Sequence, residues 1–305
     1  MNFYNNKCIC ESNKSTVIFE AYDYNFDTTN YRSDIRKCDN CSSIFPDIFP
    51  DSRSLDIAYS SYYTRKLSMG PMPLKRRFLR YLQGEYSFRS LPLGPRRLLD
   101  YGCGSGDFLL EILKLRPEFS LVGSDISTPP DGYQNNFNFY EYNSIDKAGK
   151  YYDNITLSHV IEHVADPIDT FSSLMPLLES NGSIWIATPN ADSSLISSFR
   201  QYARDIDFPR HRVIFTHKAM EDTLDRCGYD CKFLIPPLVN TFTCFFQCVS
   251  NLMNDKSLSL GVRYWRLACV SVNLIKTHLI FNKSNIRARS EIVCVATKKL
   301  TISRS

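Results

Sequence analysis

Glycines and acidic residues share one short stretch of the chain, Leu98-Leu-Asp-Tyr-Gly-Cys-Gly-Ser-Gly-Asp107. The apolar residues at its start predict a strand that ends at Asp100, and three glycines follow at alternate positions: Gly102, Gly104 and Gly106. Glycine permits positive φ angles and lets a ligand approach the backbone closely. A helix that begins near Asp107 would point its free N–H groups at the same ligand. The stretch therefore predicts a ligand-binding loop between a strand and a helix.

The acids around this loop indicate a ligand that carries positive charge. A dinucleotide loop needs G-x-G-x-x-G, whose third glycine would stand at position 107, where this chain has Asp. Asp100 would repel a phosphate but suits the amino group and sulfonium of S-adenosylmethionine (SAM). Asp125 ends the next predicted strand, where a carboxylate can accept hydrogen bonds from both ribose hydroxyls. The alternative is a tight turn followed by an unrelated surface acid.

Strands and helices alternate on both sides of the loop. Hydrophobic periodicity predicts strands over 97–101, 121–124, 137–142, 154–158, 183–187 and 291–296, and helices over 108–115, 168–178 and 219–226. Asn181-Gly182 is expected to close the second of these helices. Such alternation predicts an α/β fold, with a doubly wound, mostly parallel sheet covered by helices on both faces.

With these elements, the chain resembles the class I SAM-dependent methyltransferases over about residues 96–236 and the final strand. The resemblance implies a Rossmann-like sheet, SAM as cofactor and transfer of its methyl group. It also implies cofactor contacts at Asp100, Gly102, Cys103, Gly104, Asp107, Asp125, Ile126, Asn143, Ser144 and Ser158. The remaining parts are then a Cys-rich segment (1–50), a helical linker (51–95), a helical cap insertion (237–289) and the final strand with its tail (290–305).

A second group of chemically active residues, Ser158-His-Val-Ile-Glu-His-Val-Ala-Asp-Pro167, follows the fourth predicted strand. Substrate-facing residues lie at the carboxyl ends of strands in such sheets. A histidine there can act as a general base toward a hydroxyl nucleophile. On a helix, His159 would share a face with Glu162 or His163 and, with His211, hold a divalent ion that acidifies a substrate hydroxyl. The alternative is that Glu162 and His163 merely cap and pack a helix start.

This group also resembles a subgroup that includes ubiquinone-pathway O-methyltransferases, in which Glu-His-Val and Asp-Pro recur at this point. Thr188-Pro-Asn190 and Pro209-Arg-His211 fit the same subgroup. Some related enzymes carry Glu-x-x-Glu-His and a later His as metal ligands, whereas His159 replaces the first Glu here. The resemblance implies catalytic roles for His159, Glu162, His163 and His211, and a small molecule or a glycan intermediate as the acceptor.

Four cysteines near the start, Cys8-Ile-Cys10 and Cys38-Asp-Asn-Cys41, have the number and residue type of a structural zinc site. A segment this short lacks an apolar core, so a metal would hold it together. It resembles the N-terminal zinc-binding piece of many sugar and polysaccharide methyltransferases, which carries Cys-x-x-Cys twice. The first pair here is Cys-x-Cys. The alternative is four unrelated reduced thiols.

Composition limits the remaining classes. The chain has 305 residues, a net charge of +4 and an odd count of 11 cysteines without an export signal, which indicates reduced thiols and a cytoplasmic protein. The longest uncharged run, residues 233–254, is too polar for a transmembrane helix. The aromatic-rich insertion is expected to be a packed cap, with a wall for a lipid-linked or glycan substrate, or peripheral membrane contact, as alternatives.

We therefore expect an enzyme that transfers a methyl group in line from SAM to an acceptor oxygen, mainly by positioning the reactants. Two other hypotheses stay open. An RNA methyltransferase would need a basic, aromatic stripe, and residues 1–50 are not basic enough to favour a nucleic-acid partner. A non-catalytic SAM-fold binding protein would not need the intact set of Asp100, Asp125 and the glycines.

Overall fold

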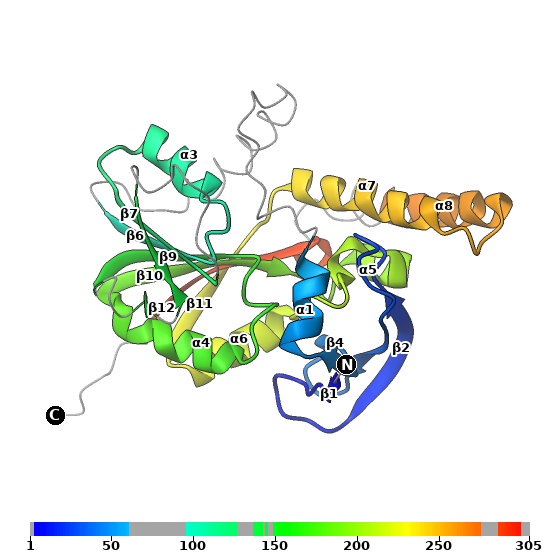
Figure 1. Cartoon of the computed structure of the whole chain (residues 1–305), viewed down its shortest axis with the longest axis horizontal. Coiled ribbons are helices and arrows are strands. Elements are labelled where there is room, and N and C mark those ends of the chain that lie inside the picture. The colour runs from blue at the N-terminus through cyan, green and yellow to red at the C-terminus, as the bar shows by residue number, and fades with distance from the viewer. Residues whose placement is uncertain are drawn as a thin grey trace.

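A seven-stranded sheet forms the centre of the molecule (Figure 1). In this computed structural model the described residues are 3–60, 96–126, 137–142, 144–145, 149, 151–275 and 286–299. The strand order is β11-β12-β10-β9-β6-β7-β8, and only β12 runs antiparallel to its neighbours. The bounds are β6 Arg97–Tyr101, β7 Ser120–Asp125, β8 Asn138–Glu141, β9 Tyr152–Ser158, β10 Leu178–Pro189, β11 Tyr229–Leu234 and β12 Glu291–Lys298. The predicted doubly wound, mostly parallel α/β sheet is confirmed.

Helices cover both faces of this sheet (Figure 1). Helix α3 (Asp107–Leu115) lies on one face, and α4 (Pro167–Leu174) and α6 (His217–Arg226) lie on the other. The central strands are apolar on both sides: Leu98 and Leu99 in β6 are both completely buried. Such two-sided burial explains why these strands read as continuous hydrophobic runs rather than as alternating ones.

The end of α4 departs from the sequence prediction, which extended this helix to residue 178. The helix ends at Leu174, the 3-10 turn Met175–Leu177 follows, and β10 begins at Leu178. Pro176 explains the early end, because proline lacks the N–H donor and clashes with the preceding turn of an α-helix. Asn181 and Gly182 lie within β10, at a shift in its pairing with β9, and do not cap the helix.

The Cys-rich segment carries its own small sheets, which the sequence did not predict. Strands β2 (Ser15–Tyr22), β3 (Arg32–Cys38) and β4 (Ile44–Pro46) form one sheet, and β1 (Phe3–Asn5) pairs with β5 (Ile48–Pro50). A bridge between Ile44 and Ile214 joins the segment to the main body. Helix α1 (Ser52–Tyr59) follows, and the rest of the expected linker, residues 61–95, lies outside the described part of the chain.

The insertion between β11 and β12 is helical, as predicted. Helices α7 (Leu238–Asn254) and α8 (Leu260–Ile275) form an arm that extends away from the sheet (Figure 1). Three shorter helical elements contact α7, namely α5 (Ser194–Phe199) and the 3-10 turns Arg200–Tyr202 and Arg204–Ile206. Residues 276–285 lie outside the described part of the chain. Within the described ranges, every helix is too short or too polar to span a bilayer.

Candidate active site

The glycine loop between β6 and α3 has the backbone that its sequence predicts. Gly102, Gly104 and Gly106 all have positive φ angles, of 82°, 54° and 73°. The N–H groups of Gly102 and Cys103 both donate to the Ser124 carbonyl, at 2.7 and 3.0 Å. A Cβ atom added to Gly102 would lie 2.2 Å from Val160 Cγ2. The first glycine is therefore required both by its backbone conformation and by the close approach of the loop that follows β9.

Two carboxylates flank this loop. Asp100 is buried at the end of β6 and accepts a 2.7 Å hydrogen bond from Thr156 Oγ1. Burial raises the pKa of Asp100 to about 7, because the ionised form loses its hydration. Asp125 ends β7, and its two carboxylate oxygens accept hydrogen bonds from Gly104 N and Ile126 N, at 2.8 and 2.7 Å. Both acids thus lie at the edge of the sheet where the sequence predicted them.

The other residues predicted to contact the cofactor differ in burial and in their position around the loop. Cys103 packs its Sγ into the core beside Gly123, and burial raises the pKa of its thiol, so only its backbone faces the loop. Asp107 is the first residue of α3, and Ile126 and Ser158 are exposed at the ends of β7 and β9. Ser144 is half-buried, and Asn143 lies outside the described residues.

A stacked tyrosine pair borders the glycine loop and was not predicted. The rings of Tyr101 and Tyr142 lie 4.4 Å apart and almost parallel, with an interplanar angle of 10°. The hydroxyl of Tyr142 lies 3.1 Å from the position of a Cβ on Gly102. The only signal in the sequence was an aromatic residue at the end of each of two strands, which is too common to indicate a site.

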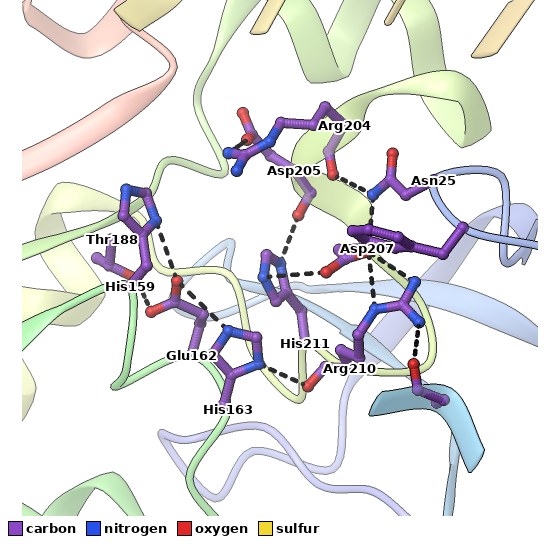
Figure 2. A network of polar contacts seen from close by, with 12 residues as sticks. Asn25, His159, Glu162, His163, Thr188, Arg204, Asp205, Asp207, Arg210 and His211 are labelled. Atoms are coloured by element: carbon purple, nitrogen blue, oxygen red, sulfur yellow. Dashed lines mark hydrogen bonds and ion pairs between the residues drawn. The ribbon is translucent and has the colours of Figure 1, made fainter. Parts of the chain in front are cut away.

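The segment after β9 is a turn, so the prediction that His159, Glu162 and His163 share a helix face is wrong. His159 has a φ of 54°, which breaks helical geometry at once, and α4 begins only at Pro167. The turn still brings the three side chains together (Figure 2): His159 Nδ1 lies 3.3 Å from Glu162 Oε1, and His163 Nε2 lies 4.0 Å from the same oxygen.

His159 lies between two carboxylates. Its Nε2 is 3.2 Å from Glu291 Oε1, at the start of β12, and its Nδ1 faces Glu162. Burial alone would lower the pKa of His159, but the two glutamates raise it to about 10. This histidine is therefore an imidazolium at neutral pH. Glu291 was missed by the sequence reasoning, because 132 residues separate it from its partner.

His163 and His211 form a second pair around Glu162 (Figure 2). Their rings lie 4.6 Å apart, edge to face. Each Nδ1 lies within hydrogen-bonding distance of a backbone carbonyl, for His163 that of Arg210 at 3.1 Å and for His211 that of Asp205 at 2.8 Å. A carbonyl can only accept, so each Nδ1 is the donor in these contacts, and in the Nδ1–H tautomer each Nε2 presents a lone pair. The hydroxyl of Tyr59 in α1 also lies 3.1 Å from His163 Nδ1. Burial lowers the pKa of His211 to about 4, which keeps it neutral.

Glu162 is the anionic centre of this group. Its side chain is completely buried, and Oε2 accepts a 2.9 Å hydrogen bond from Thr188 Oγ1. Oε1 forms the 3.3 Å ion pair with His159 but accepts no well-aligned hydrogen bond among the described residues. Burial alone would raise the pKa of Glu162, but its contact with His159 lowers it to about 2. The ligand atoms of Glu162, His163 and His211 all lie within 4.8 Å of one another. This spacing suits a shared cation.

The four N-terminal cysteines converge as the sequence suggested. The Sγ–Sγ distances are 3.3 Å for Cys8–Cys41 and 3.5 Å for both Cys8–Cys10 and Cys10–Cys38. Four sulfurs bound tetrahedrally to zinc at 2.3 Å would lie about 3.8 Å apart. All four thiols are free of disulfides. The cluster also packs on the main body, because the Cys41 carbonyl accepts a 2.8 Å hydrogen bond from Thr216 Oγ1 at the start of α6.

Comparison with known proteins identifies the family of this chain through a family model. No curated protein matches the chain significantly. Among solved structures, a SAM-dependent methyltransferase from Archaeoglobus fulgidus is 21% identical, with a TM-score of 0.45, covering 74% of this chain and all of the other. The plantazolicin methyltransferase BpumL is 20% identical, with a TM-score of 0.46, covering 82% and 91%. A family model described as a methyltransferase domain matches residues 74–232, slightly more than half of the chain. The chain belongs to the methyltransferase-domain family.

Proposed function

We propose that this methyltransferase uses SAM to methylate a hydroxyl group on a small molecule or a glycan intermediate. The observation that carries the proposal is the meeting of two sites at one edge of the sheet. The glycine loop with its two acids contacts the turn that follows β9 through Gly102 and Val160. That same turn presents Glu162 and His163.

Different residues of the chain would bind different parts of SAM. Asp100 and Asp125 attract its ammonium and its ribose hydroxyls, and the positive-φ backbone of the glycine loop lets the ligand lie against it. When bound, SAM would supply an activated methyl group, and the turn at residues 159–163 would face the acceptor. Transfer would replace the S–CH₃ bond by an O–CH₃ bond, leave neutral S-adenosylhomocysteine and release the proton of the acceptor hydroxyl to solvent. Holding the two reactants in line supplies most of the acceleration.

We further propose that Glu162, His163 and His211 hold a divalent cation. Two observations fit such a ligand set. The buried Glu162 Oε1 is paired with His159 but accepts no well-aligned hydrogen bond among the described residues, and His163 and His211 each place Nδ1 at a backbone carbonyl. When bound, the cation would lower the pKa of the acceptor hydroxyl. His159 stays outside the set, because both of its ring nitrogens face glutamates. Its positive charge holds Glu162 ionised and in place.

The four cysteines are proposed to hold a structural zinc ion. Their convergence from two separate stretches of a segment with short strands supports a closed, tetrahedral site without a catalytic role.

Two measurements test the proposed function. Calorimetric titration of the full chain with SAM should show one site. Incubation with SAM and a panel of nucleotide sugars should yield a product heavier by one methyl group, detected by mass spectrometry. The absence of SAM binding would refute the proposal.

The role of the cluster is tested with variants. His211→Ala and His163→Ala should lower turnover at least about 100-fold while SAM affinity stays unchanged, since general-base or metal-assisted activation is worth about that much. His217→Ala is the matched control, because His217 is buried on α6 and packs against Phe233. Turnover that persists in full after chelation of the cluster's cation would contradict a role for the cation in the reaction.

A further inference from the structure

One side chain of the Cys-rich segment, that of Asp23, contacts Arg210, the residue before His211. Asp23 follows β2 and is completely buried. Its carboxylate accepts hydrogen bonds from Phe26 N and Thr28 N, at 3.3 and 3.0 Å, and from the guanidinium of Arg210. Arg210 is itself completely buried, between Asp23 and Asp207. A buried arginine with two carboxylates is held far more rigidly than a surface ion pair.

Arg210 precedes His211 in the sequence, and its backbone carbonyl lies within hydrogen-bonding distance of His163. Its carbonyl lies 3.1 Å from His163 Nδ1, and the guanidinium donates to Asp207 Oδ1 at 2.9 Å. Asp207 Oδ2 in turn lies 3.8 Å from His211 Nε2. Figure 2 shows this network from Asn25 through Asp207 and Arg210 to both histidines. The orientation of the His163 ring therefore depends on where Arg210 is fixed, whereas the His211 ring is held by the Asp205 carbonyl.

A second residue of the same segment supports this arrangement. Asn25 Nδ2 donates to Asp207 Oδ1 at 2.7 Å and to the Arg204 carbonyl at 2.8 Å. Its Oδ1 accepts a 2.8 Å hydrogen bond from Asn251 of α7. Asn6 Nδ2 also donates to the Arg212 carbonyl, at 2.8 Å, so at least three side chains of the Cys-rich segment contact the loop that carries His211.

We propose that Asp23 is a positioning residue for the cation-binding cluster, acting through Arg210 on His163. The inference rests on the proposed function of that cluster. It makes the Cys-rich segment a wall of the catalytic site, because the Asp23 carboxylate fixes Arg210, whose carbonyl shares His163 Nδ1 with the Tyr59 hydroxyl. Outer partners of this kind typically change metal affinity about 10–100-fold when removed.

The test uses the full, zinc-loaded chain with histidine labelled by ¹⁵N. In the wild type, long-range ¹H–¹⁵N correlation should show His163 and His211 as single Nδ1–H tautomers. Asp23→Asn should convert His163 to a mixture of tautomers. Binding of Mn²⁺, which prefers nitrogen and oxygen ligands to thiolates, should weaken at least about tenfold by electron paramagnetic resonance. Affinity for SAM should stay within about twofold, since Asp23 lies outside the glycine loop.

Three further variants keep the result interpretable. Asp23→Glu should restore part of the Mn²⁺ affinity. Thr28→Val, which removes a hydroxyl that donates to Asp23 and accepts from Arg210 at 3.5 Å, should give a smaller change of the same sign if Asp23→Asn does not fold. Glu11→Gln is the matched control, because Glu11 also joins the segment to the main body, through a 2.7 Å pair with Arg226.

The outcomes separate the two proposals. Folded Asp23→Asn protein with wild-type tautomers and wild-type Mn²⁺ affinity overturns the positioning role. Wild-type protein that binds no Mn²⁺ refutes the cation at the cluster, and the histidine tautomers then decide the role of Asp23 by themselves.

Discussion

At the scale of single residues, Asp100 combines burial with a charge that the cofactor needs. Its pKa of about 7 means that folding disfavours the ionised carboxylate. Its contribution to folding stability is therefore full below its ordinary pKa of 3.8 and is lost as pH rises through 7. Binding of SAM requires the ionised form. We expect the Kd for SAM to rise as pH falls below 7, by up to about tenfold per pH unit, in calorimetric titrations between pH 5.5 and 8.

Variants distinguish protonation of Asp100 from protonation of SAM as the cause of the pH dependence. Asp100→Asn should bind SAM about 100-fold more weakly, in line with the loss of a buried charge-assisted hydrogen bond, and with a flatter pH profile. Asp153→Asn is the matched control. Asp153 lies near the start of β9, away from the glycine loop, and pairs with Arg96, so this variant should keep wild-type affinity for SAM. An unchanged pH profile in Asp100→Asn would remove Asp100 from the binding site.

Gly102 provides a steric test of the same loop. In Gly102→Ala, the new Cβ would meet Val160 Cγ2 at 2.2 Å on a backbone with a φ of 82°. We expect a loss of about 2–4 kcal/mol of folding stability and no detectable SAM binding, measured by thermal unfolding and calorimetry. Gly261→Ala in α8, where a Cβ would meet nothing within 4 Å, should instead be neutral or stabilise the fold. Wild-type SAM affinity in Gly102→Ala would show that the loop does not contact the cofactor.

Which of these residues the sequence could predict depends on how far apart their partners lie in the chain. Asp100 and the glycines act through neighbours within a strand–loop–helix unit, so local spacing was sufficient. Glu291 and Asp23 act on histidines 132 and more residues away, and Asp23 reaches His163 through Arg210, 187 positions along the chain. A lone buried acid in the sequence carries no sign of such a partner.

At the scale of elements, the Asp-Pro pair at 166–167 serves to start α4. Asp166 Oδ1 accepts hydrogen bonds from the N–H groups of Ile168 and Asp169, at 2.8 and 3.0 Å, and Pro167 takes the first helical position. Asp166→Ala should lower the free energy of unfolding by about 1 kcal/mol without changing SAM affinity. Asp166→Ser should restore most of the stability in denaturant titrations. A loss of SAM binding in Asp166→Ala would mean that the motif does more than cap.

The elements that the sequence predicted well are the ones whose pattern is locally sufficient. The buried strands of the sheet are continuous apolar runs, and α3 and α6 follow at helical spacing. The failures have physical causes. Pro176 ended α4 early, and the positive φ of His159 produced a turn where a helix was expected. The small sheets of the Cys-rich segment are held by the cysteine cluster and by contact with the main body, which no local pattern reveals.

At the scale of the whole molecule, zinc is expected to hold the Cys-rich segment against the sheet. Cys38→Ser should release one zinc ion per chain, measured by elemental analysis, and lower stability by more than about 2 kcal/mol, since structural zinc contributes about 10 kcal/mol in small peptides. Cys269→Ser, at an exposed position on α8, is the matched control and should change neither. Unchanged metal content in Cys38→Ser would contradict the zinc site.

The position of β12 has a consequence for the order in which the protein assembles. This last described strand inserts between β10 and β11, and its first residue, Glu291, is the second partner of His159. During synthesis, β10 and β11 leave the ribosome before the helical arm and β12. Until β12 is made, the edges of β10 and β11 that pair with it have no partner strand. Such edges favour association with other chains. The sheet and the environment of His159 are therefore completed in one late step, and a nascent chain that stops within the arm would have neither.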